Sequence, residues 1–429
     1  MRRFTILLTF VLAGVGLFLF FNIKKDVQLA QVSQITEVLV EENKEVKKPE
    51  IDPNADIPLQ RPLENPPEVV KAVYATGWSG GYQPRLNYLI DLIKKTELNA
   101  IIIDIKDYSG ELSYHTELEE VERYSRGREI KILHPNAMIK KLHDAGIYVI
   151  ARQTIFQDPV LALARTDLAL VSSSTRKQWK DNKGVMWVDA ASKDVWDYNI
   201  TIAKDALARG FDEINFDYIR FPTDGNMDDI RYPFWDGIKL KRFVIRDFWK
   251  YLRKALPDAK LSADLFGLVT LNYGDIGIGQ NIDDAFNYFD AIAPMVYPSH
   301  YHPGFDGYKN PAKVPYEVVY SSMAEANERL KHYISNAQNS TSTEVYLVKN
   351  PKLRPWLQDF DLGVSYDAAK VRAQIMATYS AAGACQKSAS STDLSGFVCD
   401  DSKMSLVGGW MLWDPKNVYT KEALQESDN

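Results

Sequence analysis

The chain has 429 residues, of which 45% are hydrophobic and 12% aromatic, which excludes disorder along its whole length and allows at least one large core. Its net charge of −6 comes from interspersed charges, and because a nucleic-acid interface needs a basic face, nucleic acid is not an expected partner. The 23 tyrosines and 9 tryptophans suit sugar-stacking surfaces and aromatic-rich cores alike.

The amino terminus predicts an export signal or a membrane anchor. An uncharged apolar run of eighteen residues, 4–21, follows Arg2 and Arg3 and is closed by Lys24 and Lys25. This is about the minimum length that crosses a bilayer. A removable signal peptide would have a shorter apolar region and a small-residue cleavage site, and neither is evident. We therefore expect residues 1–25 to be a transmembrane signal-anchor in the cell membrane, with the rest of the chain outside the cytoplasm.

A flexible linker is expected at residues 26–67. This stretch is charged and rich in proline, and it lacks the apolar periodicity that would bury one face. It would separate the membrane from a folded domain at residues 68–420, which is followed by a C-terminal tail at 421–429.

The folded domain alternates short apolar runs with amphipathic helical patterns. The helix expected at 238–256 carries one apolar stripe, and the helix at 194–209 has Ser192 as a candidate cap before it and Gly210 after it. Strands separated by helices predict a parallel sheet, and eight such units fit an α/β fold of the (β/α)8 TIM-barrel type. The expected strands are 69–78, 99–106, 146–156, 211–221, 260–266, 290–297, 353–360 and 408–413.

The strand expected at 211–221 carries two polar residues on one face. Residues two apart share a face, so Asn215 and Asp217 point one way while Phe216 and Tyr218 point the other way. Because a buried carboxylate is costly without a partner or a task, the pair is either a satisfied core contact or part of a site. We interpret Asp217 as a catalytic residue at the mouth of the barrel.

Asp264 lies on the next predicted strand and would stand beside Asp217. Glycoside hydrolysis needs two carboxylates, one as nucleophile or base and one as a protonated acid, and proximity raises one of the two pKa values. The alternative is an ion-paired structural aspartate. The carboxyl ends of barrel strands line the active site, which gives as predicted substrate-binding residues Trp78, Asp104, Lys106, Arg152, Asn215, Arg220, Tyr297, His300, Gln358 and Trp413.

Two parts of this set have more than one interpretation. Asp104 and Lys106 would share one face of their strand, where with Arg152 they would form either a binding site for sugar hydroxyls or a structural network. The tryptophans of strands one, seven and eight either fill the barrel or form a stacking wall. Trp413, immediately before Asp414, is the preferred stacking platform.

Two other catalytic classes have weaker support. The run 77–81 matches the nucleophile elbow of serine hydrolases, but Ser79 follows the first strand of the domain and is not followed by the expected helix. We interpret this run as a loop whose glycines let the backbone approach a ligand. His300 and His302 would supply only two metal ligands, and a catalytic metal needs a third, so neither a metal nor another cofactor is expected.

The two cysteines of the chain, Cys385 and Cys399, enclose thirteen residues rich in serine. In an oxidising compartment such a pair predicts a disulfide. It would lie between the seventh helix and the eighth strand, at the end of the barrel opposite the predicted site.

Several motifs over about residues 69–415 together resemble a bacterial family of glycoside hydrolase domains. The motifs are Gly77-Trp-Ser-Gly-Gly81, Asp104-x-Lys-Asp107, Arg152-x3-Phe156-x-Asp158-Pro159, Phe216-Asp-Tyr-Ile-Arg-Phe-Pro222, Pro294-Met-x-Tyr-Pro-Ser-His300, Arg354-Pro-Trp-Leu-Gln-Asp-Phe360 and Gly409-x2-Leu-Trp413.

This resemblance implies a TIM barrel related to glycosidases. By similarity to retaining barrel enzymes, Asp217 would be the nucleophile after strand four and Asp264 the acid after strand five, where those enzymes commonly have a longer glutamate. We therefore expect a membrane-tethered, retaining glycosidase that acts on an extracytoplasmic polysaccharide or oligosaccharide. The competing interpretation is a non-catalytic glycan-binding barrel of the cell envelope.

Overall fold

The computed structural model describes residues 55–339, 347–387, 397–400, 403 and 407–427. The predicted transmembrane segment and most of the predicted linker, residues 1–54, lie outside these ranges. In the part of the chain that the structure describes, no helix combines the length and the apolar character needed to cross a membrane.

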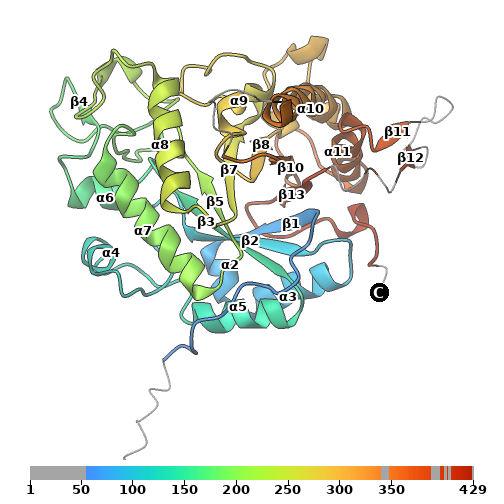
Figure 1. The fold of residues 1–429 in the computed structure, drawn as a ribbon, viewed down its shortest axis with the longest axis horizontal. Coiled ribbons are helices and arrows are strands. Elements are labelled where there is room, and N and C mark those ends of the chain that lie inside the picture. Colours follow the sequence, from blue (N-terminus) through green and yellow to red (C-terminus); the bar gives the residue numbers. More distant parts are fainter. Residues whose placement is uncertain (1–54, 340–346, 388–396, 401–402, 404–406, 428–429) are drawn as a thin grey trace, which may run out of the picture. The chain divides into compact units, whose positions relative to one another are not determined.

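Eight parallel strand positions close into a barrel (Figure 1), which confirms the predicted (β/α)8 fold. One position is divided between β9 (Lys352–Leu353) and β10 (Trp356–Gln358), because Pro355 interrupts the strand. β10 pairs with both β8 and β13, and β13 pairs with β1, so the sheet has no open edge. The other strands are β1 (Val70–Ala75), β2 (Ala100–Lys106), β3 (Tyr148–Thr154), β5 (Glu213–Asp217), β7 (Leu261–Phe266), β8 (Ala291–Met295) and β13 (Gly409–Trp413).

Helices surround the barrel (Figure 1). The longer ones are α3 (Gln83–Lys94), α5 (Pro135–Asp144), α7 (Lys193–Arg209), α8 (Lys241–Ala255), α10 (Pro315–Asn339) and α11 (Ala368–Ala381). Shorter elements are α2 (Gly77–Gly81), α4 (Glu119–Tyr124), α6 (Pro159–Ala164), α9 (Ile282–Ala285), the 3-10 turns η1 (Met227–Asp229), η2 (Gly267–Thr270), η3 (Pro298–His300), η4 (Phe305–Gly307), η5 (Pro311–Lys313) and η7 (Lys421–Ala423), and the strands β4 (Val171–Ser172), β6 (Ile230–Arg231), β11 (Cys385–Lys387) and β12 (Phe397–Cys399).

The structure confirms some of the predicted helix ends and not others. Gly210 ends α7 in the left-handed conformation with φ 104°, as predicted. Ser192 precedes α7, but its side chain makes no capping hydrogen bond. Helix α8 begins at Lys241, three residues later than predicted.

The loop predicted at 77–81 is instead the short helix α2. The side chain of Thr76 caps it by accepting a hydrogen bond from the Ser79 N–H at 3.1 Å. A Cβ atom at Gly77 would lie 2.4 Å from Ser113 Oγ, and one at Gly81 would lie 1.8 Å from the carbonyl oxygen of Lys131. The glycines therefore allow close packing within the protein and not the approach of a ligand.

Side chains alternate between two cores along each strand. Outward-facing residues pack under the helices, and examples are Val73, Ile103, Val149 and Ile214. Inward-facing residues fill the barrel, and examples are Ala72, Ile102, Ile150, Ala293 and Met411. The apolar interior ends toward the carboxyl ends of the strands, where polar side chains take over.

The folded unit begins at Asp56, earlier than the expected end of the linker. The Asp56 carboxylate accepts hydrogen bonds from the N–H groups of Asn136 and Ala137, at 2.6 and 3.1 Å, in the first turn of α5. Further along, the Leu63 N–H donates to Asp212 Oδ1 at 2.6 Å. These contacts use carboxylates and backbone groups, so apolar periodicity gives no sign of them.

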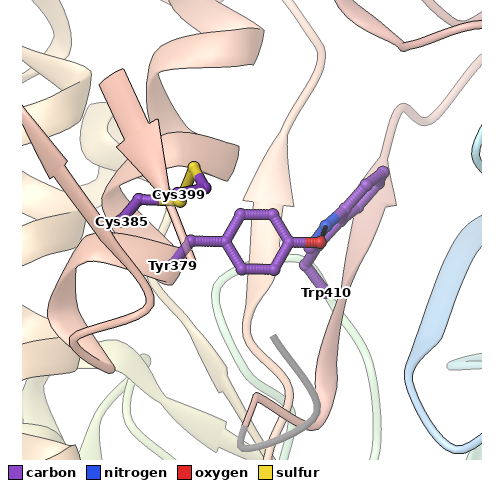
Figure 2. Close-up of a disulfide and its surroundings, with 4 residues drawn as sticks. All are labelled: Tyr379, Cys385, Cys399 and Trp410. Atoms are coloured by element: carbon purple, nitrogen blue, oxygen red, sulfur yellow. Dashed lines mark hydrogen bonds between the residues drawn. A yellow bond between two sulfur atoms is a disulfide. The ribbon is translucent and has the colours of Figure 1, made fainter. Parts of the chain in front are cut away.

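Cys385 and Cys399 form the predicted disulfide and lie opposite each other in the antiparallel pair β11 and β12. Figure 2 shows the bridge together with Tyr379 of α11 and Trp410 of β13. The Tyr379 hydroxyl accepts a hydrogen bond from Trp410 Nε1 at 3.1 Å. Cys385 and Trp410 both belong to the core under the helices, so the disulfide cross-links the outer layer of the barrel.

Candidate active site

One guanidinium group meets three carboxylates at the carboxyl ends of the strands. Arg152 of β3 lies 2.6 Å through Nη1 from Asp104 Oδ1 and 3.3 Å through Nε from Asp264 Oδ2, and its Nη2 contacts Asp217. The acids come from β2, β7 and β5, and strand register places Arg152 opposite both Asp104 and Asn215. The structure thus brings these five predicted site residues together.

Asp264 is a buried carboxyl group with the side chain only 1% exposed. Its Oδ1 accepts hydrogen bonds from Asn215 Nδ2 at 2.8 Å and from Trp356 Nε1 at 2.7 Å. Burial, followed by the negative charge of Asp217, raises the pKa of Asp264 to about 7, although Arg152 and both hydrogen bonds act in the opposite direction. Asp264 can therefore hold a proton near neutral pH.

Asp217 is the last residue of β5, and the backbone turns sharply after it. Tyr218 has a φ of 52°, in the left-handed region that non-glycine residues seldom adopt, and its N–H donates to Asp217 Oδ1 at 2.5 Å. The strand therefore stops before the predicted end at 221. The prediction that Tyr218 points away from Asp217 is wrong, because the turn brings Tyr218 into the lining of the same cavity.

A cavity of about 380 Å³ opens over the carboxylates. Asp217, Asp264 and Arg152 are among the residues that line it. Aromatic side chains form much of the remainder, and Trp413 lies 5.3 Å from Tyr297 between ring centroids. Flat apolar rings next to polar groups suit a sugar, which has apolar faces and hydroxyl edges. The aromatic lining residues are Tyr218, Phe266, Tyr297, Tyr301, Trp356 and Trp413.

Lys106, predicted to share a face with Asp104, does not line the cavity. A register shift in the pairing of β2 with β3 falls between these two residues. The Lys106 ammonium group is fully buried, lies 2.7 Å from Asp158 Oδ2 and donates to the Thr154 carbonyl at 2.9 Å. The prediction of a shared face is therefore wrong, and Lys106 belongs to a structural network.

Five other predicted binding residues also lie outside the cavity lining. Asp104 and Asn215 are two of them, and they contact the lining residues Arg152 and Asp264. Trp78 is 47% exposed on α2, which carries it away from the end of β1. Arg220 is buried, with its guanidinium stacked over Trp187. Gln358 is buried and accepts a hydrogen bond from the Ser299 N–H at 3.1 Å, so it orders the turn that carries His300.

His300 lines the cavity, as predicted. Burial, followed by the nearby positive charge of Lys183, lowers the pKa of His300. Within the described ranges, no cluster of three or more His, Cys, Asp or Glu side chains is placed to hold a metal ion.

The sequence analysis missed several residues of the site, including the lining residues Tyr218, Phe266 and Tyr301. Tyr74 and Lys183 were missed as well. The Tyr74 hydroxyl donates a short hydrogen bond to Asp104 Oδ2, and the two-residue spacing of inward positions in β1 would have identified it. Lys183, which lies on a hairpin, also lines the cavity. In the sequence it lies far from the end of any barrel strand. Nothing in the local sequence separates it from other surface lysines.

Comparison with known proteins gives a family and a fold. A family model described as "putative glycosyl hydrolase domain" matches residues 72–385. A search of the curated proteins found no match. A solved structure of a hypothetical protein from Ruminiclostridium thermocellum ATCC 27405 is 39% identical, with 45% of this chain and 96% of that one covered and a TM-score of 0.42.

The PgaB (BpsB) glycoside hydrolase domain from Bordetella bronchiseptica is 15% identical, with 84% of this chain and 99% of that one covered. Its TM-score of 0.53 shows that the two chains share the barrel fold. At this level of identity the likeness extends to the fold alone.

Proposed function

Because the chain belongs to the family described as "putative glycosyl hydrolase domain", we propose that it is a glycosidase in which Asp217 is the nucleophile and Asp264 the acid and base. One observation carries this assignment. Two carboxyl groups on neighbouring strands line one cavity and face one guanidinium, and burial together with the negative charge of Asp217 raises the pKa of Asp264 to about 7. A carboxyl group that keeps its proton near neutral pH suits the role of the acid.

The first chemical step uses both groups. Protonated Asp264 gives its proton to the glycosidic oxygen as the bond from that oxygen to the anomeric carbon breaks. An oxygen of Asp217 attacks the same carbon from the opposite face and forms a glycosyl ester. Asp217 is held for this attack by Arg152 and by the Tyr218 N–H.

In the second step Asp264 acts as the base, and Asp217 is released from the ester. Asp264, now a carboxylate, takes a proton from water as the water oxygen attacks the anomeric carbon and the ester bond to Asp217 breaks. The configuration at the anomeric carbon is then retained. Retention is supported by the contact of both carboxylates with one guanidinium, because retaining enzymes hold their two carboxyl groups closer together than inverting enzymes.

Other residues of the cluster position these groups. Arg152 would keep Asp217 in place and limit the repulsion between the acids, while Asn215 and Trp356 hold Asp264 Oδ1. Trp413 and Tyr297 would stack against sugar rings in the cavity.

We further propose that the enzyme is anchored by residues 1–25 and acts outside the cytoplasm on a polysaccharide. The apolar run at 4–21 supports an anchor or export signal. The Cys385–Cys399 disulfide supports an oxidising compartment, because such bonds are rare in the cytosol.

A broad glycan panel tests the proposal. We expect the purified protein to release reducing sugar from at least one polysaccharide, and the release to continue in the presence of a metal chelator. Binding without release would instead support the non-catalytic glycan-binding barrel. Activity that the chelator abolishes would support a metal-dependent hydrolase that uses His300 and His302.

A further inference from the structure

The cavity contains a cation that no carboxylate neutralises. Lys183 lines it together with Asp217, Asp264 and Arg152. Arg152 faces three carboxylates. Lys183, by contrast, takes part in none of the ion pairs formed between described residues. Among the lining residues, its positive charge therefore remains available to a ligand.

The backbone of Lys183 is held firmly in place. It lies in a tight turn where the Gly184 N–H donates to the Asp181 carbonyl at 2.9 Å, and Asp181 Oδ1 accepts from the N–H groups of Lys183 and Val185, both at 2.9 Å. Asp181 is itself buried, and its Oδ2 accepts from Trp187 Nε1 at 3.0 Å. This anchoring reduces the entropy that Lys183 would lose on binding a ligand.

The charge of Lys183 also acts on a second residue of the cavity lining. His300, which follows β8, has its pKa lowered by burial and then by Lys183. A neutral imidazole beside an ammonium group leaves hydrogen-bonding capacity and one net positive charge at this part of the cavity. The carboxylates lie deeper, where Arg152 holds them.

We propose that Lys183 forms a subsite for an anionic sugar, so that the substrate is a glycan with negatively charged groups near the cleaved bond. This inference rests on the proposed glycosidase function. A cavity floor with excess carboxylates repels an anionic glycan, and a cation at the rim offsets that repulsion. Lysine is a compact charge with three donors, so a carboxylate, a sulfate and a phosphate all suit it.

Matched glycans and matched variants test the subsite. The probes are a panel of hexuronic-acid oligosaccharides, their carboxyl-reduced neutral counterparts, and sulfated and phosphorylated forms of the neutral set. Binding to the full chain is measured by calorimetry at low salt. We expect Lys183→Met to weaken binding of an anionic probe by about three- to tenfold and to leave its neutral counterpart unchanged. The anionic probe that loses most affinity identifies the charged group.

Lys180→Met is the matched control. Lys180 is exposed on the same hairpin and does not line the cavity, so we expect its loss to change neither affinity. Preference of the wild-type chain for neutral glycans, or an equal effect of Lys183→Met on both members of a pair, would contradict the subsite and leave the glycosidase proposal standing. Failure of every glycan to bind or be cleaved would contradict the proposed function and the subsite with it.

Discussion

The two ends of the barrel interior both bury an arginine against carboxylates, but in different proportions. Near the amino ends of the strands, Glu213 of β5 pairs with Arg354, one acid to one base. Ser262 Oγ donates to Glu213 at 2.5 Å, and the Tyr148 hydroxyl donates at 3.3 Å. At the carboxyl ends, Arg152 faces three acids.

We propose that this difference separates a structural pair from a reactive one. Glu213 and Asp217 lie on the same face of one strand, so position in the sequence pattern does not distinguish them. At the amino end the charges balance within the pair. At the other end burial, followed by the negative charge of Asp217, raises the pKa of Asp264 to about 7, so that Asp264 can hold a proton near neutral pH. The ratio of acids to arginines thus supports the proposal that the carboxyl ends of the strands carry the chemistry.

The largest expected effect is a loss of turnover when Asp217, at the carboxyl ends of the strands, is replaced. Asp217→Asn keeps the shape of the side chain but removes the proposed nucleophile, so we expect kcat to fall by about 10⁴-fold with little change in glycan affinity. Kinetics on the best glycan of the panel and calorimetric binding measure the two quantities. Turnover near the wild-type level would remove Asp217 from the mechanism.

The corresponding substitution at the amino ends of the strands should lower the stability of the protein and not its turnover. Glu213→Gln leaves Arg354 buried without a counter-charge, so we expect the free energy of unfolding to fall by about 3–5 kcal/mol while kcat of the folded protein stays close to wild type. Urea unfolding and steady-state kinetics test this. If Glu213→Gln abolished turnover without loss of stability, the contrast between the two ends would be wrong.

A smaller stability effect is expected outside the barrel. Replacing Cys385 and Cys399 together by serine removes a cross-link with a sequence separation of 14, which should lower the free energy of unfolding by about 3 kcal/mol. The bridge cross-links the outer helical layer of the barrel. At a temperature where the oxidised protein and the double variant are both folded, their kcat values should therefore be equal. Thermal unfolding of the oxidised protein and the double variant gives the comparison, and a tenfold loss of kcat would connect the disulfide to the site.

A smaller effect on turnover is a pH dependence set by Asp264. Its pKa of about 7 means that the acid loses its proton above neutral pH, so kcat/KM should fall toward a tenfold loss per pH unit there. The same raised pKa contributes stability that is fully present below about pH 4, where an unfolded aspartate also holds its proton, and that is lost as pH rises through about 7.

Asp264→Asn should remove the contribution of Asp264 to the pH dependence of kcat/KM and to that of the unfolding free energy. Its unfolding free energy should vary less between pH 4 and 7 than that of the wild-type chain, and the alkaline fall in kcat/KM should disappear from its residual activity. An unchanged alkaline fall in Asp264→Asn would assign that proton to another group.

The barrel could be predicted from the sequence because apolar runs and helical stripes are local patterns that buried strands and helices require. Asp217, Asp264 and Arg152 could be predicted because strand ends converge on one face of such a barrel. The register shift that turns Lys106 outward and the left-handed turn at Tyr218 could not, because both depend on packing between distant segments. Lys183 also needed the structure, because its hairpin reaches the site only in the folded chain.

The central claim is that the excess of carboxylates around Arg152 makes Asp217 the nucleophile, and trapping of the glycosyl ester tests it most directly. Activated fluoro-sugars matched to the cleaved glycan are incubated with the protein, which is then digested and analysed by mass spectrometry. We predict one added sugar, on Asp217, and none in Asp217→Asn. An ester on Asp264 or Glu213, or hydrolysis with inversion and no ester, would contradict the claim.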